Sequence, residues 1–197
     1  LHSWEGAESF KEEWDVVLYE FRKFVRLLLK QNPNVLSMLW LRNQDYLHTS
    51  YVGQTLLDLR RIFRHRTRAF SSFVGYANGQ MKRMTQYQKQ GYMGAKRAAL
   101  VERHGYDTKN AAHLIRLLRM GEEYIRTGEL QVFREDRDEI IAIKRGDWEL
   151  GQVRVEADRL FKTCHDAMEH SALPESIDED EIERFVIATI QIHAGIS

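Results

Sequence analysis

The chain has 197 residues, 43% of them hydrophobic, which is enough to bury one core of ordinary size. Its formal net charge is zero at pH 7. Its apolar stretches, such as 24–29, are interrupted by Lys and Arg well before the roughly 20 residues that a membrane-spanning helix needs. Residues 1–14 lack the features of a secretory signal, and the single Cys164 excludes an internal disulfide. We therefore expect a cytoplasmic protein with no membrane partner.

The N-terminal part of the chain predicts one strand and two helices. Residues 14–19 combine β-branched and aromatic side chains in a short run, which is typical of a strand. The spacing of apolar residues then becomes helical as far as Asn32. Pro33 suits the first turn of a second, short helix through Trp40, and a loop around 41–51 follows.

Helical periodicity dominates the rest of the chain. The expected helices cover residues 53–63, 69–87, 108–126, 138–144, 149–170 and 178–193. Asp107 suits the N-cap of the long helix expected over residues 108–126, and Gly128 suits its C-terminal end. Residues 130–133 are expected to form a short strand or edge segment. The predicted fold class is α+β and predominantly α-helical.

Charge is distributed very unevenly along the chain. Residues 60–119, the basic segment, contain 14 Lys and Arg against two acidic residues, so their net charge is +12 and the flanks together carry −12. Such a separation favours a polyanionic ligand. The alternative interpretation is a basic surface neutralised by acidic residues that follow Met120 in the same molecule.

The helix after Asp107 carries the first candidate site. Lys109, His113 and Arg116 fall on one stripe, and the opposite side of the helix is apolar. Two cations and a histidine at this spacing predict a helix that lines a phosphate-binding cleft, although a solvated helix face has the same pattern. Tyr106 and Asp107 stand at the helix start, where a nucleotide could also be bound.

A second candidate lies near the start of the basic segment, where arginines are interleaved with aromatic residues. This mixture suits contact with a nucleic-acid backbone together with base stacking. Most of the aromatic residues also recur at helical spacing, which is equally typical of a core. The candidate nucleic-acid-binding residues are Arg60, Arg61, Arg64, Arg66 and Arg68.

One long run is specific enough to carry a resemblance to a family. Residues 105–118, followed by Glu122-Glu123, Thr127-Gly128-Glu129-Leu130 and Arg145-Gly146, resemble the C-terminal half of the predicted nucleotidyltransferases of the DNA polymerase beta superfamily, including members associated with RNA repair. Residues 14–24 and 32–40 are similar to the middle of the same family. The resemblance spans residues 15–146.

The resemblance implies a divalent-metal enzyme. In that superfamily a Gly-Ser turn and a pair of carboxylates bind Mg²⁺ and a nucleoside triphosphate, and a third carboxylate on a later strand completes the site. Asp15 is the candidate catalytic and metal-binding third carboxylate, with Glu20 as the second choice. The Gly-Ser turn and the first pair are expected before Leu1, so the chain is expected to be part of a longer protein.

These arguments lead to one expected function and two alternatives. Residues 1–50 are expected to be the remainder of a nucleotidyltransferase core, and residues 51–197 a helical domain. The expected reaction transfers a nucleotidyl group from a nucleoside triphosphate to an acceptor, an RNA end, with Mg²⁺ as cofactor. The alternatives are a non-catalytic, helical nucleic-acid-binding protein and a helical interaction module.

Overall fold

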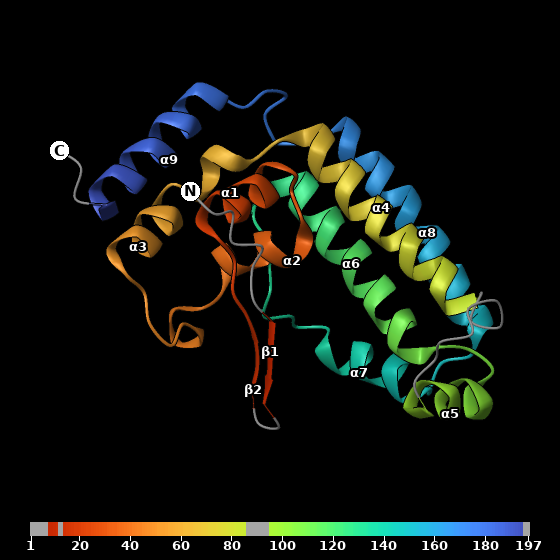
Figure 1. Ribbon diagram of the computed structural model, residues 1–197. Coiled ribbons are helices and arrows are strands. Elements are labelled where there is room, and N and C mark those ends of the chain that lie inside the picture. The colour runs from red at the N-terminus through yellow and green to blue at the C-terminus, as the bar shows by residue number, and fades with distance from the viewer. Residues whose placement is uncertain (1–7, 12–13, 86–94, 195–197) are drawn as a thin grey trace.

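The computed structural model describes residues 8–11, 14–85 and 95–194, and these residues are predominantly helical, as predicted (Figure 1). The strands β1 (Glu8–Lys11) and β2 (Trp14–Val17) pair in an antiparallel hairpin, with Phe10 opposite Asp15. The predicted strand is therefore confirmed, although it ends two residues earlier than expected. The fold class is confirmed as well.

The hairpin leads into four short elements, and side chains cap the first two of them. These elements are α1 (Phe21–Leu29), α2 (Pro33–Leu36), η1 (Ser37–Trp40) and η2 (Asn43–Asp45). The Glu20 carboxylate accepts hydrogen bonds from the backbone N–H groups of Arg22 and Lys23, and thereby caps α1. Asn32 caps α2 in the same way, and Pro33 occupies its first turn as expected.

Longer helices form the rest of the described chain. They are α3 (Tyr51–Asp58), the turn η3 (Arg60–Phe63), α4 (Arg66–Thr85), α5 (Ala95–His104), α6 (Thr108–Thr127), α7 (Arg137–Arg145), α8 (Leu150–Glu169) and α9 (Glu179–Ala194). Asp107 caps α6, and Gly128 ends it with a left-handed φ of 75°, so both predicted ends are confirmed. None of these helices is long and apolar enough to cross a membrane.

Three local expectations differ from the structure. The helix expected at 53–63 is divided at Leu59 into α3 and the 3₁₀ turn η3. Residues 130–133 do not form a strand, because β1 and β2 pair with each other and no strand in the described part of the chain is available as a partner. Leu130 instead packs into the core. Helix α5 was not predicted from the sequence. Residues 86–94, on which the expected end of the preceding helix falls, lie outside the described residues.

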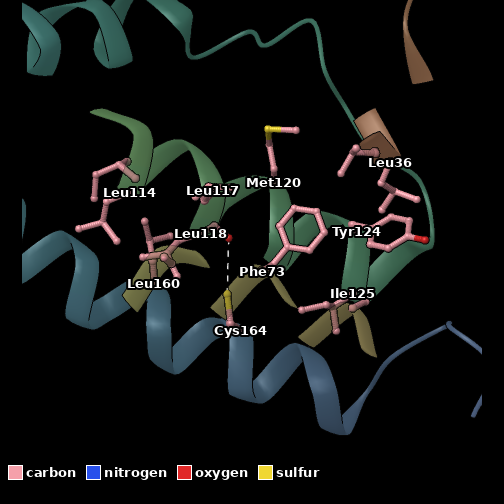
Figure 2. Close-up of a cluster of buried hydrophobic side chains, with 14 of the residues drawn as sticks. Leu36, Phe73, Leu114, Leu117, Leu118, Met120, Tyr124, Ile125, Leu160 and Cys164 are labelled. Carbon is pink, nitrogen blue, oxygen red and sulfur yellow. Dashed lines mark hydrogen bonds between the residues drawn. The ribbon is translucent and has the colours of Figure 1, made fainter. Parts of the chain in front are cut away.

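Helix α6 is the central element, and it packs against α4, α7 and α8 (Figure 1). Leu114, Leu118 and Leu160 belong to the hydrophobic cluster between α6 and α8 that Figure 2 shows. In this cluster the thiol of Cys164 donates a 3.5 Å hydrogen bond to the carbonyl of Leu118, and burial raises the pKa of that thiol to about 12. The same cluster includes Val25 from α1, so residues on both sides of position 50 share one core. The division into two domains at position 50 stays a prediction.

Candidate phosphate-binding site

The first three turns of α6 expose a single stripe of side chains. Between Thr108 and Leu118 only Lys109, His113 and Arg116 are not buried, because the other residues pack against the neighbouring helices. These are the three residues that the helical spacing had grouped together. The fold therefore places them side by side on the surface of its central helix.

The stripe forms one wall of a pocket of about 370 Å³, which we call the basic pocket. Helix α4 supplies a second wall and α7 a third. The lining residues are Gln80, Arg83, Lys109, Asn110, Ala112, His113, Arg116, Ile140 and Lys144. Among the residues that the structure describes, this lining contains four Arg and Lys side chains and no carboxylate.

The cations of the basic pocket are not neutralised by neighbouring acids. Across the described ranges, none of Arg83, Lys109, Arg116 and Lys144 has a carboxylate within ion-pair distance. Three different helices hold these charges at fixed positions, so their mutual repulsion is built into the fold. An anion bound in the pocket would relieve that repulsion.

His113 is electrically neutral in this setting. The guanidinium of Arg116 lies 2.9 Å from Nδ1 of His113, and we assign Arg116 as the donor and His113 as the tautomer with its proton on Nε2. Burial, followed by the positive charges of Arg116, Arg83 and Lys109, lowers the pKa of His113 to about 4. Its Nε2–H group is therefore a neutral donor at pH 7, beside the four charged side chains.

Gln80 adds an uncharged polar group to the pocket. Its side chain is only 6% exposed and lines the basic pocket, yet it makes no hydrogen bond to any residue that the structure describes. The amide atoms of Gln80 are not among the buried side-chain atoms that lack a partner, so they are open to the solvent of the pocket. The Gln80 amide is thus free to bind a polar ligand group.

Tyr106 and Asp107 have structural partners. Tyr106 is 1% exposed, and its hydroxyl donates a 2.6 Å hydrogen bond to the carbonyl oxygen of Trp148. Asp107 is equally buried and accepts hydrogen bonds from the backbone N–H and the side-chain amide of Asn110. These two side chains hold the start of α6 in place beneath the basic pocket and do not line it.

The five arginines between positions 60 and 68 lie apart from the basic pocket. Four of them pair with acidic groups further along the chain: Arg61 at 2.7 Å and Arg64 at 4.0 Å from Glu129, Arg66 with Glu175, and Arg68 at 2.6 Å from Glu179. Arg60 lies over the ring of Trp40, 5.5 Å from its centroid. Acidic residues of the same molecule therefore balance much of the charge of this cluster, as the alternative interpretation of the sequence expects.

Arg119 differs from Arg116 because it is paired with carboxylates. It lies three residues after Arg116 on α6, but its guanidinium donates hydrogen bonds to Asp136, Glu139 and Glu156. These partners raise its pKa further despite its burial. Arg119 therefore ties α6 to α7 and α8 and leaves no net charge for a ligand.

Carboxylates that could hold Mg²⁺ do not gather in the described part of the chain. No group of three or more His, Cys, Asp or Glu side chains there is close enough to bind a metal ion. Asp15 lies in β2, but its side chain falls outside the described residues. Both carboxylate oxygens of Glu20 accept hydrogen bonds from the start of α1. Mg²⁺ as a cofactor and Asp15 as its ligand therefore stay predictions.

Sequence reasoning missed six residues that line the basic pocket, namely Gln80, Arg83, Asn110, Ala112, Ile140 and Lys144. Arg83 and Lys144 lie near the C-terminal ends of helices, where cations are common because they interact favourably with the helix dipole. Only the packing of α4 and α7 on α6 brings them to Lys109. No local signal in the sequence distinguishes them from other surface cations.

Comparison with known proteins places the chain in a family. No curated protein and no solved structure shows significant similarity to it. The sequence profile described as the RNA repair pathway DNA polymerase beta family matches residues 5–188, which is nearly the whole chain. The matched residues include the entire basic pocket, and they extend beyond both ends of the resemblance noted in the sequence. The chain belongs to the RNA repair pathway DNA polymerase beta family.

Proposed function

We propose that the protein transfers a nucleotidyl group from a nucleoside triphosphate to an RNA end, and that the basic pocket holds a phosphate group of one of these two substrates. The observation that supports this proposal is the set of four cations without acidic partners, from three helices, around one small pocket. Membership of the family supports the type of reaction.

The composition of the pocket suits phosphate chemistry. Phosphoryl and nucleotidyl transfer rely largely on positioning and on cations that offset negative charge as it develops. Arg83 and Arg116 can each offer two parallel N–H groups to phosphate oxygens, whereas Lys109 and Lys144 act as point charges. The neutral Nε2–H of His113 and the amide of Gln80 complete this set of donors. No carboxylate among the described lining residues competes with a phosphate for them.

We further propose that the reaction uses Mg²⁺, with Asp15 as a metal ligand and catalytic residue. When bound, the metal ion would neutralise triphosphate charge and orient the reacting phosphorus. A single carboxylate does not hold two such ions, so the proposal requires additional carboxylates besides Asp15. The basic pocket is a separate feature of the described chain and acts on phosphate without the metal.

The test is a transfer assay with the protein encoded by the complete reading frame. It is incubated with Mg²⁺, each labelled nucleoside triphosphate in turn, and a pool of RNA. We expect label in RNA with the wild type, loss of label with Asp15→Asn, and a loss of tenfold or more with Lys109→Ala. Lys82→Ala is the matched control, because Lys82 is an exposed cation on α4 that does not line the basic pocket.

Two results would overturn the proposal. The first is an absence of transfer with every triphosphate, despite salt-sensitive binding of RNA, which would leave a non-catalytic nucleic-acid-binding protein. The second is equal transfer by Lys109→Ala and Lys82→Ala, which would separate the basic pocket from the reaction.

A further inference from the structure

A second basic depression lies beside the basic pocket. It is a groove of about 790 Å³ between α1 and α4, which we call the α1–α4 groove. It is lined by Arg26, Leu27, Leu29, Lys30, Asn32, Arg68, Ser71, Ser72 and Tyr76. Arg26 and Lys30 have no ion-pair partner among the described residues, and Arg68 pairs with Glu179 at the surface.

The two depressions meet on helix α4. Tyr76 lines the α1–α4 groove and Gln80 lines the basic pocket, and these residues are one helical turn apart, about 6 Å along the axis. At 100° per residue, Arg68, Ser72, Tyr76 and Arg83 fall within a stripe about 80° wide. The stripe runs for about 22 Å from Arg68 to Arg83.

Two glycines leave the helix bare here, Gly79 on the stripe and Gly75 about 20° outside its edge. A Cβ atom added at Gly75 or Gly79 would meet no other atom within 4 Å, so no neighbouring element of the described chain requires a glycine there. Glycine in a helix interior is unfavourable relative to alanine. A second molecule that approaches the backbone closely would account for both positions. Gly79 lies between Tyr76 and Arg83 on the stripe.

Tyr76 supplies an aromatic surface in the middle of the stripe on α4. Tyr76 is 39% exposed, and its hydroxyl accepts a 2.6 Å hydrogen bond from the Asn32 amide. This hydrogen bond fixes the ring. An exposed, fixed aromatic ring between two groups of cations is the arrangement that stacks an unpaired base while the cations follow the phosphates.

From these observations we infer that a single-stranded RNA lies along α4, from the α1–α4 groove across Tyr76 and the bare helix at Gly79, with its end in the basic pocket. The inference rests on the proposed function for the choice of RNA as the acceptor. A path of about 22 Å corresponds to a site on the order of four nucleotides. A base-paired duplex would have no free base for Tyr76, and a lone triphosphate would fill one pocket and leave the groove empty.

The first test measures binding without nucleoside triphosphate, so that no transfer occurs. Fluorescence anisotropy is recorded for the full-length protein with labelled oligoribonucleotides of two to eight residues and with a blunt hairpin. We expect affinity to rise with length to about four nucleotides and then to level off. The hairpin should bind at least tenfold more weakly than the single strand of the same length.

Substitution of the path provides a sharper test. Gly79→Leu should lower the affinity for the single strand at least tenfold, because its side chain would occupy the bare surface. Gly151→Leu is the matched control, since a Cβ at that exposed position of α8 also meets no other atom within 4 Å. Tyr76→Leu should weaken binding about fivefold or more, whereas Tyr76→Phe retains the ring and should bind nearly as well as the wild type.

A salt titration tests the cations separately from the stacking. Arg83→Gln should reduce the dependence of log affinity on log salt by about 0.7, the value for one phosphate contact on a single strand. Lys82→Gln, at the preceding position on the same helix, should leave that slope nearly unchanged.

The inference is overturned if Gly79→Leu and Gly151→Leu bind the single strand equally while circular dichroism shows both folded, or if the hairpin binds as tightly as the single strand. Its failure can be told apart from failure of the proposed function. Transfer to RNA by the wild type together with unaltered binding by Gly79→Leu would rule out the RNA path and leave the proposed function standing. Single-strand binding along the path with no transfer would rule out the proposed nucleotidyl transfer and leave the RNA path standing.

Discussion

The hydroxyl of Tyr124 donates a 2.9 Å hydrogen bond to the side-chain oxygen of Gln31, and both side chains are completely buried. Gln31 is in the left-handed region, with φ at 54°, directly after α1. Its side-chain nitrogen donates to the carbonyl oxygens of Leu28 and Phe63. One glutamine thus joins the end of α1, the turn η3 and the central helix α6.

The first prediction concerns this contact. Tyr124→Phe should lower the free energy of unfolding by about 1–2 kcal/mol, because the side-chain oxygen of Gln31 loses its donor in a place that water does not reach. Urea denaturation measures the change. Tyr46→Phe is the control, since the Tyr46 hydroxyl donates to the carbonyl of Met38 at the surface, where water can replace it. Equal losses in the two variants would contradict the prediction.

The second prediction concerns the charge network on α6. Arg119 has a side chain that is 15% exposed, and its replacement by Met would leave Asp136, Glu139 and Glu156 without their shared cation. We expect a loss of about 3 kcal/mol in the free energy of unfolding. Arg159→Met should cost less than about 1 kcal/mol, because Arg159 is 59% exposed and pairs with Glu156 from the solvent side.

A comparably small loss in Arg119→Met would mean that the three carboxylates find other partners or solvent. Thermal and urea denaturation of both variants at low and moderate salt would show this directly. The difference between the two variants should persist when salt is added, because Arg119 is shielded from solvent and Arg159 is not.

The third prediction concerns pH. Because the pKa of His113 is lowered to about 4 in the folded protein, the unfolded chain binds more protons than the folded one between about pH 6.5 and pH 4. The free energy of unfolding should therefore fall as the pH falls through this range, by about 2–3 kcal/mol from this residue. His113→Gln should lack this contribution.

Urea denaturation at several pH values compares the two proteins. Other groups that titrate in the same range, such as His65, are present in both and cancel in the difference. Parallel curves for the wild type and His113→Gln would show that His113 is protonated without cost. Neither its burial nor the charges of Arg116 and Arg83 would then lower its pKa.

The fourth prediction tests the arginines between positions 60 and 68. If Arg66 and Arg68 contact RNA, their acidic partners compete with it. The double variant Glu175→Gln, Glu179→Gln should then bind single-stranded RNA about two- to fivefold more tightly at low salt, since each exposed pair is worth less than about 1 kcal/mol. Unchanged affinity would assign Arg66 and Arg68 to the fold. It would leave the basic pocket, with Arg26 and Lys30 of the α1–α4 groove, as the contact surface.

The sequence predicted the elements whose ends depend on local chemistry. Asp107 and Gly128 mark the ends of α6 because a cap carboxylate and a left-handed glycine act within one turn. The strand expected at 130–133 was wrong because a strand needs a partner, and the local composition cannot supply one. Helix α5 was missed because its charged and small residues, between Gly94 and Gly105, lack a clear apolar period.

For the candidate site, too, the sequence predicted only what depends on a single helix. Helical spacing placed Lys109, His113 and Arg116 on one stripe, since all three belong to one element. The remaining walls could not be predicted, because Arg83 and Lys144 reach the site only through packing of α4 and α7 on α6. Nor does a count of charges reveal which arginine has an acidic partner, as Arg116 and Arg119 illustrate.

The contrast between these two arginines has a practical consequence for handling the protein. Arg119 is enclosed by carboxylates that salt screens poorly, whereas the basic pocket around Arg116 faces solvent without any counter-charge of its own. Added salt should therefore release an anion from the pocket at concentrations that leave the helices packed. If the basic pocket holds nucleic acid as proposed, a wash at high ionic strength during purification should remove it while the protein stays folded.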